Sequence, residues 1–323
     1  MANTRSHTQQ SVIYAVDYCG EVAKVCSQAM VSDIGAGVPS RIHSNYEHAM
    51  QSINRLPTLP RYRDLIGTLL SGIDDDTMPE ELRRYAGYTL PEQCKDTRVS
   101  EICQQFNYVL RKPEYGFSGI REDDVAHSVA LALQVAGVSE HFAPAEQRFH
   151  HLGRGVTYAL IHDLDELIGG DVATLGLSKE QMDAKASADA DAIEELIRRY
   201  PDLALLDRLV DYAKQSRRDS RIVKIHDKLT PSLSHTENSG KVLIGAPFFI
   251  TNAQFYIESY TSTSHKLAKP KYIELPFWLS LINEARARGV VATYGYNIGD
   301  ARELVNRHSV DCGLNIPDQW VVV

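Results

Sequence analysis

The chain has 323 residues and a mass of 36.1 kDa, which is enough for about two domains. Its hydrophobic fraction of 43% and charged fraction of 24% are ordinary for a globular protein and exclude disorder along most of its length. No apolar run approaches the roughly 18 residues of a membrane span, and the N-terminus has no long apolar core of the kind found in secretory signals.

The first region, residues 1–100, is predicted to be a helical extension. Apolar residues recur at helical spacings over 11–30 and 45–56, and few helix breakers interrupt them. A proline in the first turn followed by acidic residues predicts a further helix over 79–90. Nothing in this region carries recognisable chemistry.

The second region, residues 101–235, has the most regular helical pattern and is predicted to be the core of the protein. Capping serines, first-turn prolines, acidic starts and terminal glycines mark the helix ends. The predicted helical segments are 100–112, 123–138, 145–170 (one or two helices), 179–200, 201–216 and 219–233.

The third region, residues 236–323, is predicted to be a small α+β part. Its start is placed at the serine-, asparagine- and glycine-rich segment 232–240. A helix is expected over 273–289, with Gly289 as its stop. Runs of β-branched and aromatic residues predict strands, at 241–250, 290–296 and 319–323. The expected fold class is therefore mainly α.

The charge and the cysteines bear on partners and on compartment. The net charge of −8 makes a general nucleic-acid binder unlikely, although it leaves room for a local basic pocket. The five cysteines are widely spaced and form no CxxC motif, so a disulfide framework is not expected and a cytoplasmic location fits best.

Two histidines and two aspartates in the core region suggest a metal site. They lie in the segments VAHS, HDLDELIGGD and IVKIHDKL, as His127, His162, Asp163 and Asp227. A mixed nitrogen and oxygen ligand set suits one divalent ion such as Co, Mn, Fe, Zn or Mg. If HDLDELI is helical, His162 and Glu166 share a face, which places the Glu166 carboxylate one turn from the metal. On the same geometry Asp165 points elsewhere and is expected to be solvated.

Each of these residues also has an ordinary structural interpretation. Alone, His127 on an apolar helix is more often a hydrogen-bonded core histidine, and Asp227 before a lysine is often a surface ion pair. A second metal bound through His150 or His151 is conceivable but less favoured than surface histidines at a helix start. The ordered set of motifs is what favours a metal centre.

Over residues 111–230 the sequence resembles the HD-domain metal-dependent phosphohydrolases, and within them the 5'-deoxynucleotidase-like branch. The resemblance rests on DDVAHSVALAL, HDLDELIGGD and RIVKIHDKL, in that order. It implies an HD-domain helical bundle, and it implies that the metal ligands are His127, His162, Asp163 and Asp227. It further implies that Glu166 and Asp171 are catalytic acids. A phosphate-binding arginine is also implied, with Arg111 the first candidate and Arg121 the second.

The resemblance implies a nucleotide substrate, and removal of phosphate from deoxynucleoside 5'-monophosphates is the expected activity. The alternatives are a deoxynucleoside triphosphate triphosphohydrolase and a hydrolase of alarmones or cyclic nucleotides. A non-enzymatic nucleotide-sensing module and a nuclease are less favoured. Members of this branch often form dimers, so a homo-oligomer is implied by the resemblance alone.

Overall fold

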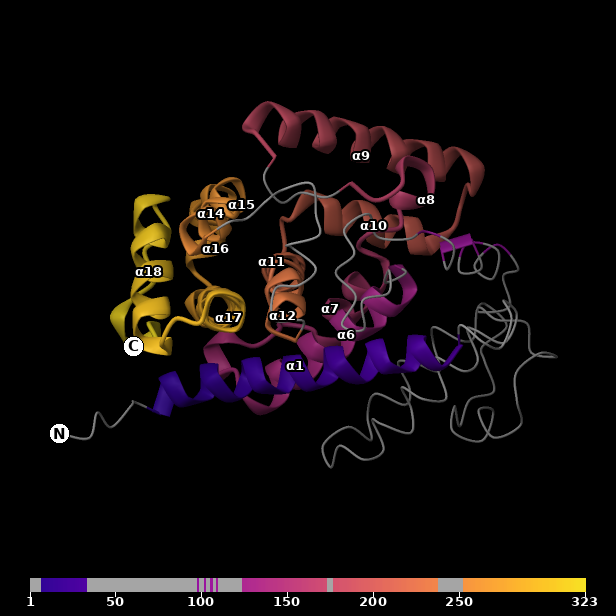
Figure 1. Cartoon of the computed structure of the whole chain (residues 1–323). Helices are drawn as coiled ribbons and strands as arrows, with labels where there is room; N and C mark the ends of the chain where they lie inside the picture. Colours follow the sequence, from indigo (N-terminus) through magenta and orange to yellow (C-terminus); the bar gives the residue numbers. More distant parts are fainter. Residues whose placement is uncertain are drawn as a thin grey trace.

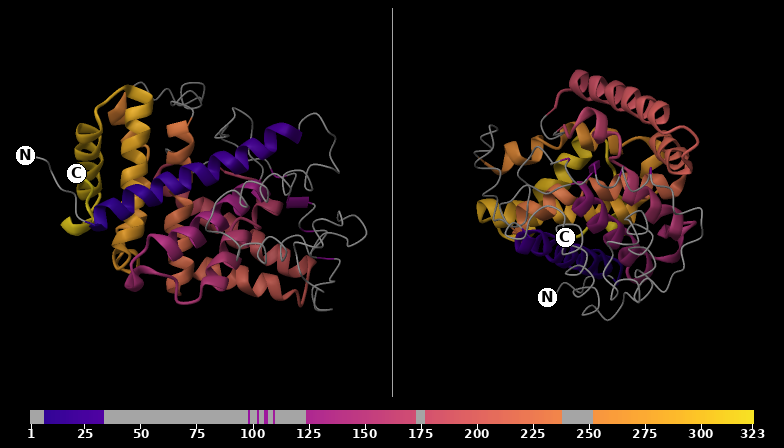
Figure 2. Two further views of the ribbon diagram at one scale, coloured as in Figure 1. Left: turned by 90° about the horizontal axis from the view of Figure 1, so that it is seen from below. Right: turned by 90° about the vertical axis from the view of Figure 1, so that its right-hand side faces the viewer.

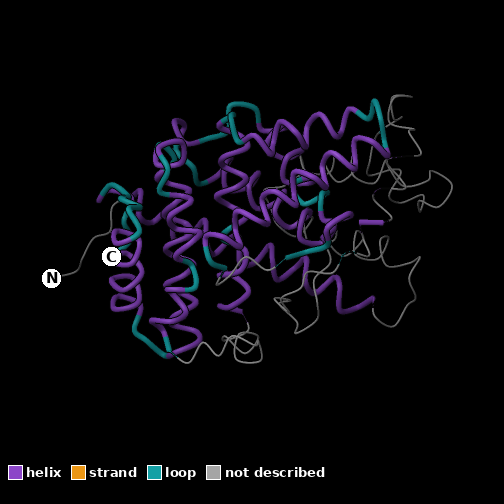
Figure 3. The backbone as a smooth tube through the Cα atoms, turned by 90° about the horizontal axis from the view of Figure 1, so that it is seen from above, coloured by secondary structure: helices purple, strands orange, loops and turns teal. Residues whose placement is uncertain are grey.

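The computed structural model describes residues 7–33, 98, 102, 105, 106, 109, 124–172, 177–237 and 252–323. Every regular element in these ranges is a helix, and the tube of Figure 3 accordingly shows only helices and loops where the chain is described. Within the same ranges, no helix combines the length and the apolar character needed to cross a membrane.

Residues 124 to 237 form a series of consecutive helices, of which α9 (Lys179–Arg199) lies along the top edge of the view in Figure 1. They confirm the helical segments predicted over this part of the chain. The elements are α6 (Asp124–His141), the 3-10 helix η3 (Ala145–Gln147), α7 (Leu152–Ile161), α8 (Glu166–Gly169), α9 (Lys179–Arg199), α10 (Ala204–Lys214), α11 (Arg218–Asp227) and α12 (Thr230–Glu237). One apolar core joins α6, α7, the end of α9 and α10. The segment 232–240, predicted as a connecting loop, is helical as far as residue 237.

The first helix, α1 (His7–Asp33), confirms the prediction over 11–30. It packs against helices from residues 124–237 and from residues 252–323. It contacts α6, α12 and α17, and Figure 2 shows it crossing the face opposite α9. The predicted helices 45–56 and 79–90 lie outside the described residues, as does most of 100–112. The division of the chain at residues 100 and 235 stays a prediction.

The last described part, residues 252–323, contains only helices and loops, so two of the predicted strands are wrong. Its elements are α14 (Ala253–Glu258), α15 (Thr261–Leu267), α16 (Pro270–Ile273), α17 (Pro276–Tyr294), α18 (Ile298–Asp311) and η4 (Asp318–Trp320). The segment 290–296 is the end of α17 and the loop after it, and 319–323 is the end of a 3-10 turn followed by a tail that forms no strand. The third predicted strand, 241–250, lies outside the described residues.

The end of α17 explains part of this error. Gly289, the predicted stop, lies inside the helix, and the hydroxyl of the buried Tyr256 lies directly against it. The helix instead ends at Gly295, whose φ of 71° is the left-handed conformation that glycine adopts most readily. Because α17 is buried nearly all round, its β-branched residues pack against neighbouring helices and do not belong to a sheet.

Two glycines in packed helices give a matched pair of stability predictions. A Cβ at Gly137 of α6 would overlap the ring and hydroxyl of Tyr18, whereas nothing lies within 4 Å of a Cβ at Gly20 of α1. We expect Gly137→Ala to lower the free energy of unfolding by about 1–2 kcal/mol, because overpacking outweighs the gain in helix propensity. Gly20→Ala should raise it by roughly 0.5–1 kcal/mol. Chemical denaturation measures both, and equal effects would contradict this packing.

Candidate metal centre

Two ten-residue helices bring distant parts of the chain together at one point. The carboxylate of Asp219, in the first turn of α11, accepts hydrogen bonds from the backbone N–H groups of His150 (2.8 Å) and His151 (3.4 Å), just before α7. The starts of α7 and α11 are thereby fixed to each other. The two helices pack against each other and have the same length, and their ends, which carry His162 and Asp227, also meet.

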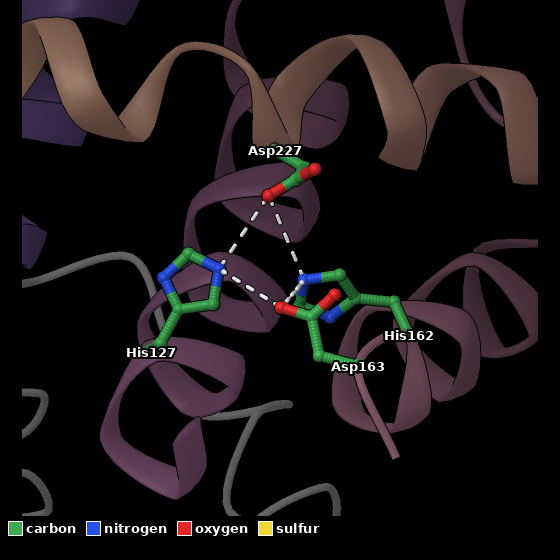
Figure 4. A group of neighbouring side chains, drawn as sticks. All are labelled: His127, His162, Asp163 and Asp227. Carbon is green, nitrogen blue, oxygen red and sulfur yellow. Dashed lines mark ion pairs between the residues drawn. The ribbon is translucent and has the colours of Figure 1, made fainter. Parts of the chain in front are cut away.

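The four predicted ligands converge at this point (Figure 4). One ligand atom from each of His127, His162, Asp163 and Asp227 lies within 4.8 Å of all the others. Nε2 of His162 is 2.9 Å from Asp163 Oδ2 and 3.6 Å from Asp227 Oδ1. Nε2 of His127, on α6, is 3.5 Å from the same Asp227 oxygen and 3.9 Å from Asp163 Oδ2.

The hydrogen bonding of the His162 ring indicates that this cluster fits a cation. Its Nδ1–H donates to the carbonyl of Ala159 at 2.8 Å, and in the neutral ring this leaves the lone pair on Nε2. That lone pair faces the Asp163 and Asp227 carboxylates, an arrangement that a positive charge between them would stabilise. The donated N–H also fixes the ring orientation, as is usual for metal-binding histidines.

The electrostatics of the protein's own charged groups agree with this fit. Burial disfavours a charged imidazole, but Asp163 and Asp227 outweigh it and raise the pKa of His162 to about 9. Although burial opposes ionisation of Asp227, Lys228, Lys224 and the two histidines hold its pKa well below the usual value. The carboxyl-terminal ends of α7 and α11 add partial negative charge at the same place.

The segment after His162 is wound more tightly than an α-helix. Backbone hydrogen bonds link Leu164 to Ile161 and Glu166 to Asp163, which are i to i+3 contacts. In this geometry residues three apart lie above one another, so Glu166 stacks on Asp163. Glu166 is 6% exposed, and it forms a second close group of carboxylates with Asp163 and Asp124.

Asp165 and Asp171 complete the segment. The expectation that Asp165 is solvated is wrong, because it is buried; burial, together with Asp163 and Asp189, raises its pKa to about 7. Gly170 ends α8 with a φ of 67°, and Asp171 follows it as a buried residue. The catalytic roles of Glu166 and Asp171 stay predictions.

The second His-Asp pair of the sequence, residues 226–227, contributes only its aspartate. Nε2 of His226 is 3.1 Å from Gln134 Oε1 on α6 and 3.6 Å from Cys19 Sγ on α1. Burial lowers the pKa of His226 to about 3, so this imidazole is neutral. It is therefore a core histidine that joins α11 to α6 and α1.

The alternative metal residues lie elsewhere. His150 and His151 are exposed, and the whole of α7 separates them from His162. Neither belongs to a group capable of holding a metal in the described part of the chain. The phosphate-binding candidates Arg111 and Arg121 lie outside the described residues.

Three charged residues beside the cluster were not assigned a role from the sequence. Lys228 and Lys224 place their Nζ atoms 2.8 Å and 3.5 Å from Asp227 Oδ2, the oxygen that faces away from the histidines. Asp124, fully buried, lies one turn before His127. The i, i+3 spacing in DDVAHS and the i, i+4 spacing in KIHDK were the signals that could have identified them.

A comparison with protein-family models gives one match, to a family described as HD domain, over residues 105–269. The match covers just over half of the chain and contains all four residues of the cluster. It continues past residue 235 to include α12, α14 and α15. No curated protein and no solved structure matches the chain.

Proposed function

The chain belongs to the HD-domain family of metal-dependent phosphohydrolases, and from this premise we propose that it removes phosphate from deoxynucleoside 5'-monophosphates. The observation that carries the proposal is the convergence of His127, His162, Asp163 and Asp227 beside the buried Glu166. The 5'-deoxynucleotidase-like motif HDLDELIGGD supports the choice of substrate.

The four residues of the cluster would hold one divalent ion. When bound, such an ion supplies Lewis-acid chemistry, polarising a phosphoryl oxygen and making water more acidic. Glu166, stacked on Asp163, orients the attacking water and accepts its proton. Asp171 donates a proton to the leaving oxygen of the sugar. Attack then breaks the phosphorus–oxygen bond and releases inorganic phosphate.

Lys224 and Lys228 bind the phosphoryl oxygens in this proposal. Both ammonium groups lie against one oxygen of Asp227, whose other oxygen faces the histidines. A metal ion held by Asp227 Oδ1 would take up part of that carboxylate's negative charge, which would leave the two lysines on Oδ2 with positive charge available to a bound phosphate. This arrangement stabilises the charge that builds on the phosphoryl oxygens.

The lysines give a testable kinetic prediction. Lys224→Met keeps the apolar stem but removes the charge, and we expect kcat/KM to fall about 10- to 100-fold, as for loss of one charged hydrogen bond. Metal content should be unchanged. The control is Lys214→Met, at an exposed position of α10. A kcat/KM equal to that of Lys214→Met would remove Lys224 from the substrate site.

A third lysine favours one alternative substrate. The Lys224 ammonium, followed by burial and by Lys228, lowers the pKa of Lys266 on α15 to about 7. The charges of Lys224 and Lys228 therefore act on Lys266, and a group of three lysines suits a more highly charged substrate than a monophosphate. The second candidate is therefore a triphosphohydrolase of deoxynucleoside triphosphates.

A product analysis tests the proposal and separates the two candidates. Protein loaded with Mn²⁺ or Co²⁺ is incubated with each deoxynucleoside mono- and triphosphate, and the products are resolved by anion-exchange chromatography. We expect inorganic phosphate from the monophosphates. Tripolyphosphate from the triphosphates would identify the second candidate, and intact nucleotides throughout would contradict both.

A further inference from the structure

A buried arginine that is not part of the four-residue metal cluster lies among the C-terminal helices. Arg286 of α17 is 1% exposed. Its Nη1 donates to Ser264 Oγ on α15 at 2.9 Å, and the centre of its guanidinium lies 4.4 Å from the centroid of the Tyr260 ring. Its Nε and Nη2 have no hydrogen-bond partner within the part of the chain that the structure describes.

Arg302, on the neighbouring helix α18, shows how this bundle ordinarily accommodates a buried arginine. Arg302 is 5% exposed, and its Nε and Nη2 donate to the two carboxylate oxygens of Glu284 at 2.8 Å and 3.0 Å. This is the side-on, two-point contact typical of arginine with an oxoanion. Arg286 presents the same edge, but no described carboxylate forms an ion pair with it.

An unpaired guanidinium in this position is costly. Burial lowers the pKa of Arg286, yet arginine stays protonated in proteins, so the charge persists. Leaving a buried charge uncompensated typically costs several kcal/mol. The Tyr260 ring that the guanidinium contacts carries a hydroxyl that accepts from Ser232 Oγ and donates to Tyr256 Oη, each at 3.3 Å.

We infer that the Nε–Nη2 edge of Arg286 binds a small phosphate-type oxoanion inside the C-terminal helices. A planar guanidinium edge with two unpartnered N–H groups matches two oxygens of such an ion. Because Arg286 is almost fully buried, the ligand proposed is a small ion such as inorganic phosphate or sulfate and not a whole nucleotide. This site does not include the metal cluster, and the inference does not depend on the proposed activity.

The test measures the part of phosphate binding that depends on Arg286, in protein whose metal centre is disabled. Asp163→Ala protein, treated with EDTA, is titrated calorimetrically with inorganic phosphate, sulfate and dAMP at constant ionic strength. We expect one phosphate per chain, and binding about 100-fold weaker when Arg286→Met is added, because two charged hydrogen bonds are lost. Sulfate should compete with phosphate.

Thermal unfolding of the same proteins gives a second readout. Phosphate should raise the Tm of the parent protein in a saturable way and leave that of Arg286→Met unchanged. In phosphate-free buffer Arg286→Met should be at least as stable as the parent, since methionine removes an uncompensated charge. Arg307→Met, at an exposed position of α18, should keep the full response to phosphate.

Arg286→Lys serves if the methionine variant does not fold. It keeps the charge without the two-point edge, so its phosphate affinity should fall at least about tenfold. The inference is overturned if phosphate fails to bind the parent, if binding survives either substitution at residue 286, or if only dAMP produces an Arg286-dependent response.

Discussion

Asp163→Ala is expected to remove both the bound metal and the phosphohydrolase activity. The Asp163 carboxylate lies against His162 Nε2 and also borders Glu166, so it joins the metal cluster to the proposed base. Loss of a residue that only orients a ligand typically weakens metal binding 10- to 100-fold, and loss of a ligand itself should exceed about 100-fold. Activity should fall to the background of the assay.

Metal content by mass spectrometry, together with the rate of phosphate release, checks this prediction. The control is Asp183→Ala, which removes an exposed carboxylate from α9 and should leave both quantities unchanged. Near-stoichiometric metal in Asp163→Ala would show that the ion binds elsewhere.

Glu166→Gln is expected to separate catalysis from metal binding. Glutamine has nearly the same shape as glutamate but cannot accept the proton of the attacking water. Because Glu166 is buried and lies outside the four-residue cluster, we expect kcat to fall about 10²- to 10⁴-fold with metal content unchanged. Steady-state kinetics at saturating metal measure the effect. A kcat within about twofold of the wild-type value would exclude Glu166 as the base, because general acid–base help is typically 10²-fold or more.

The residues of the metal cluster could be predicted because they belong to short sequence motifs. Imidazole and carboxylate groups with helical spacings allow few arrangements, and the helices that carry them have strong apolar patterns. His226 shows the limit of this reasoning. Like His162, His226 is followed by an aspartate, yet its contacts to Gln134 and Cys19 place it in the core. A dipeptide cannot reveal which face of a helix turns to a neighbour.

The error over residues 290–296 has a different physical origin. A β-branched run predicts a strand only if the surroundings supply a sheet, and here α14 and α18 surround α17 instead. Similarly, a glycine such as Gly289 is typical of a helix end, but here its lack of a side chain leaves room for the Tyr256 hydroxyl. Such close packing depends on residues that are distant in sequence, so local patterns do not encode it.

The charged groups around the site were predicted least well. Lys224 and Lys228, which contact Asp227, were not assigned a role, and the prediction for Arg111 and Arg121 stays untested because both lie outside the described residues. Asp165 was expected in solvent and is buried beneath α9, which packs on α8. Both outcomes depend on how helices separated by loops pack together, and the sequence alone does not specify that packing.

A crystal grown with Mn²⁺ and measured for anomalous scattering tests the central claim most directly. The account predicts one strong anomalous peak bounded by His127, His162, Asp163 and Asp227, with Glu166 beside it and not coordinated. A peak at any other position, or four side chains too far apart to share one ion, would contradict it.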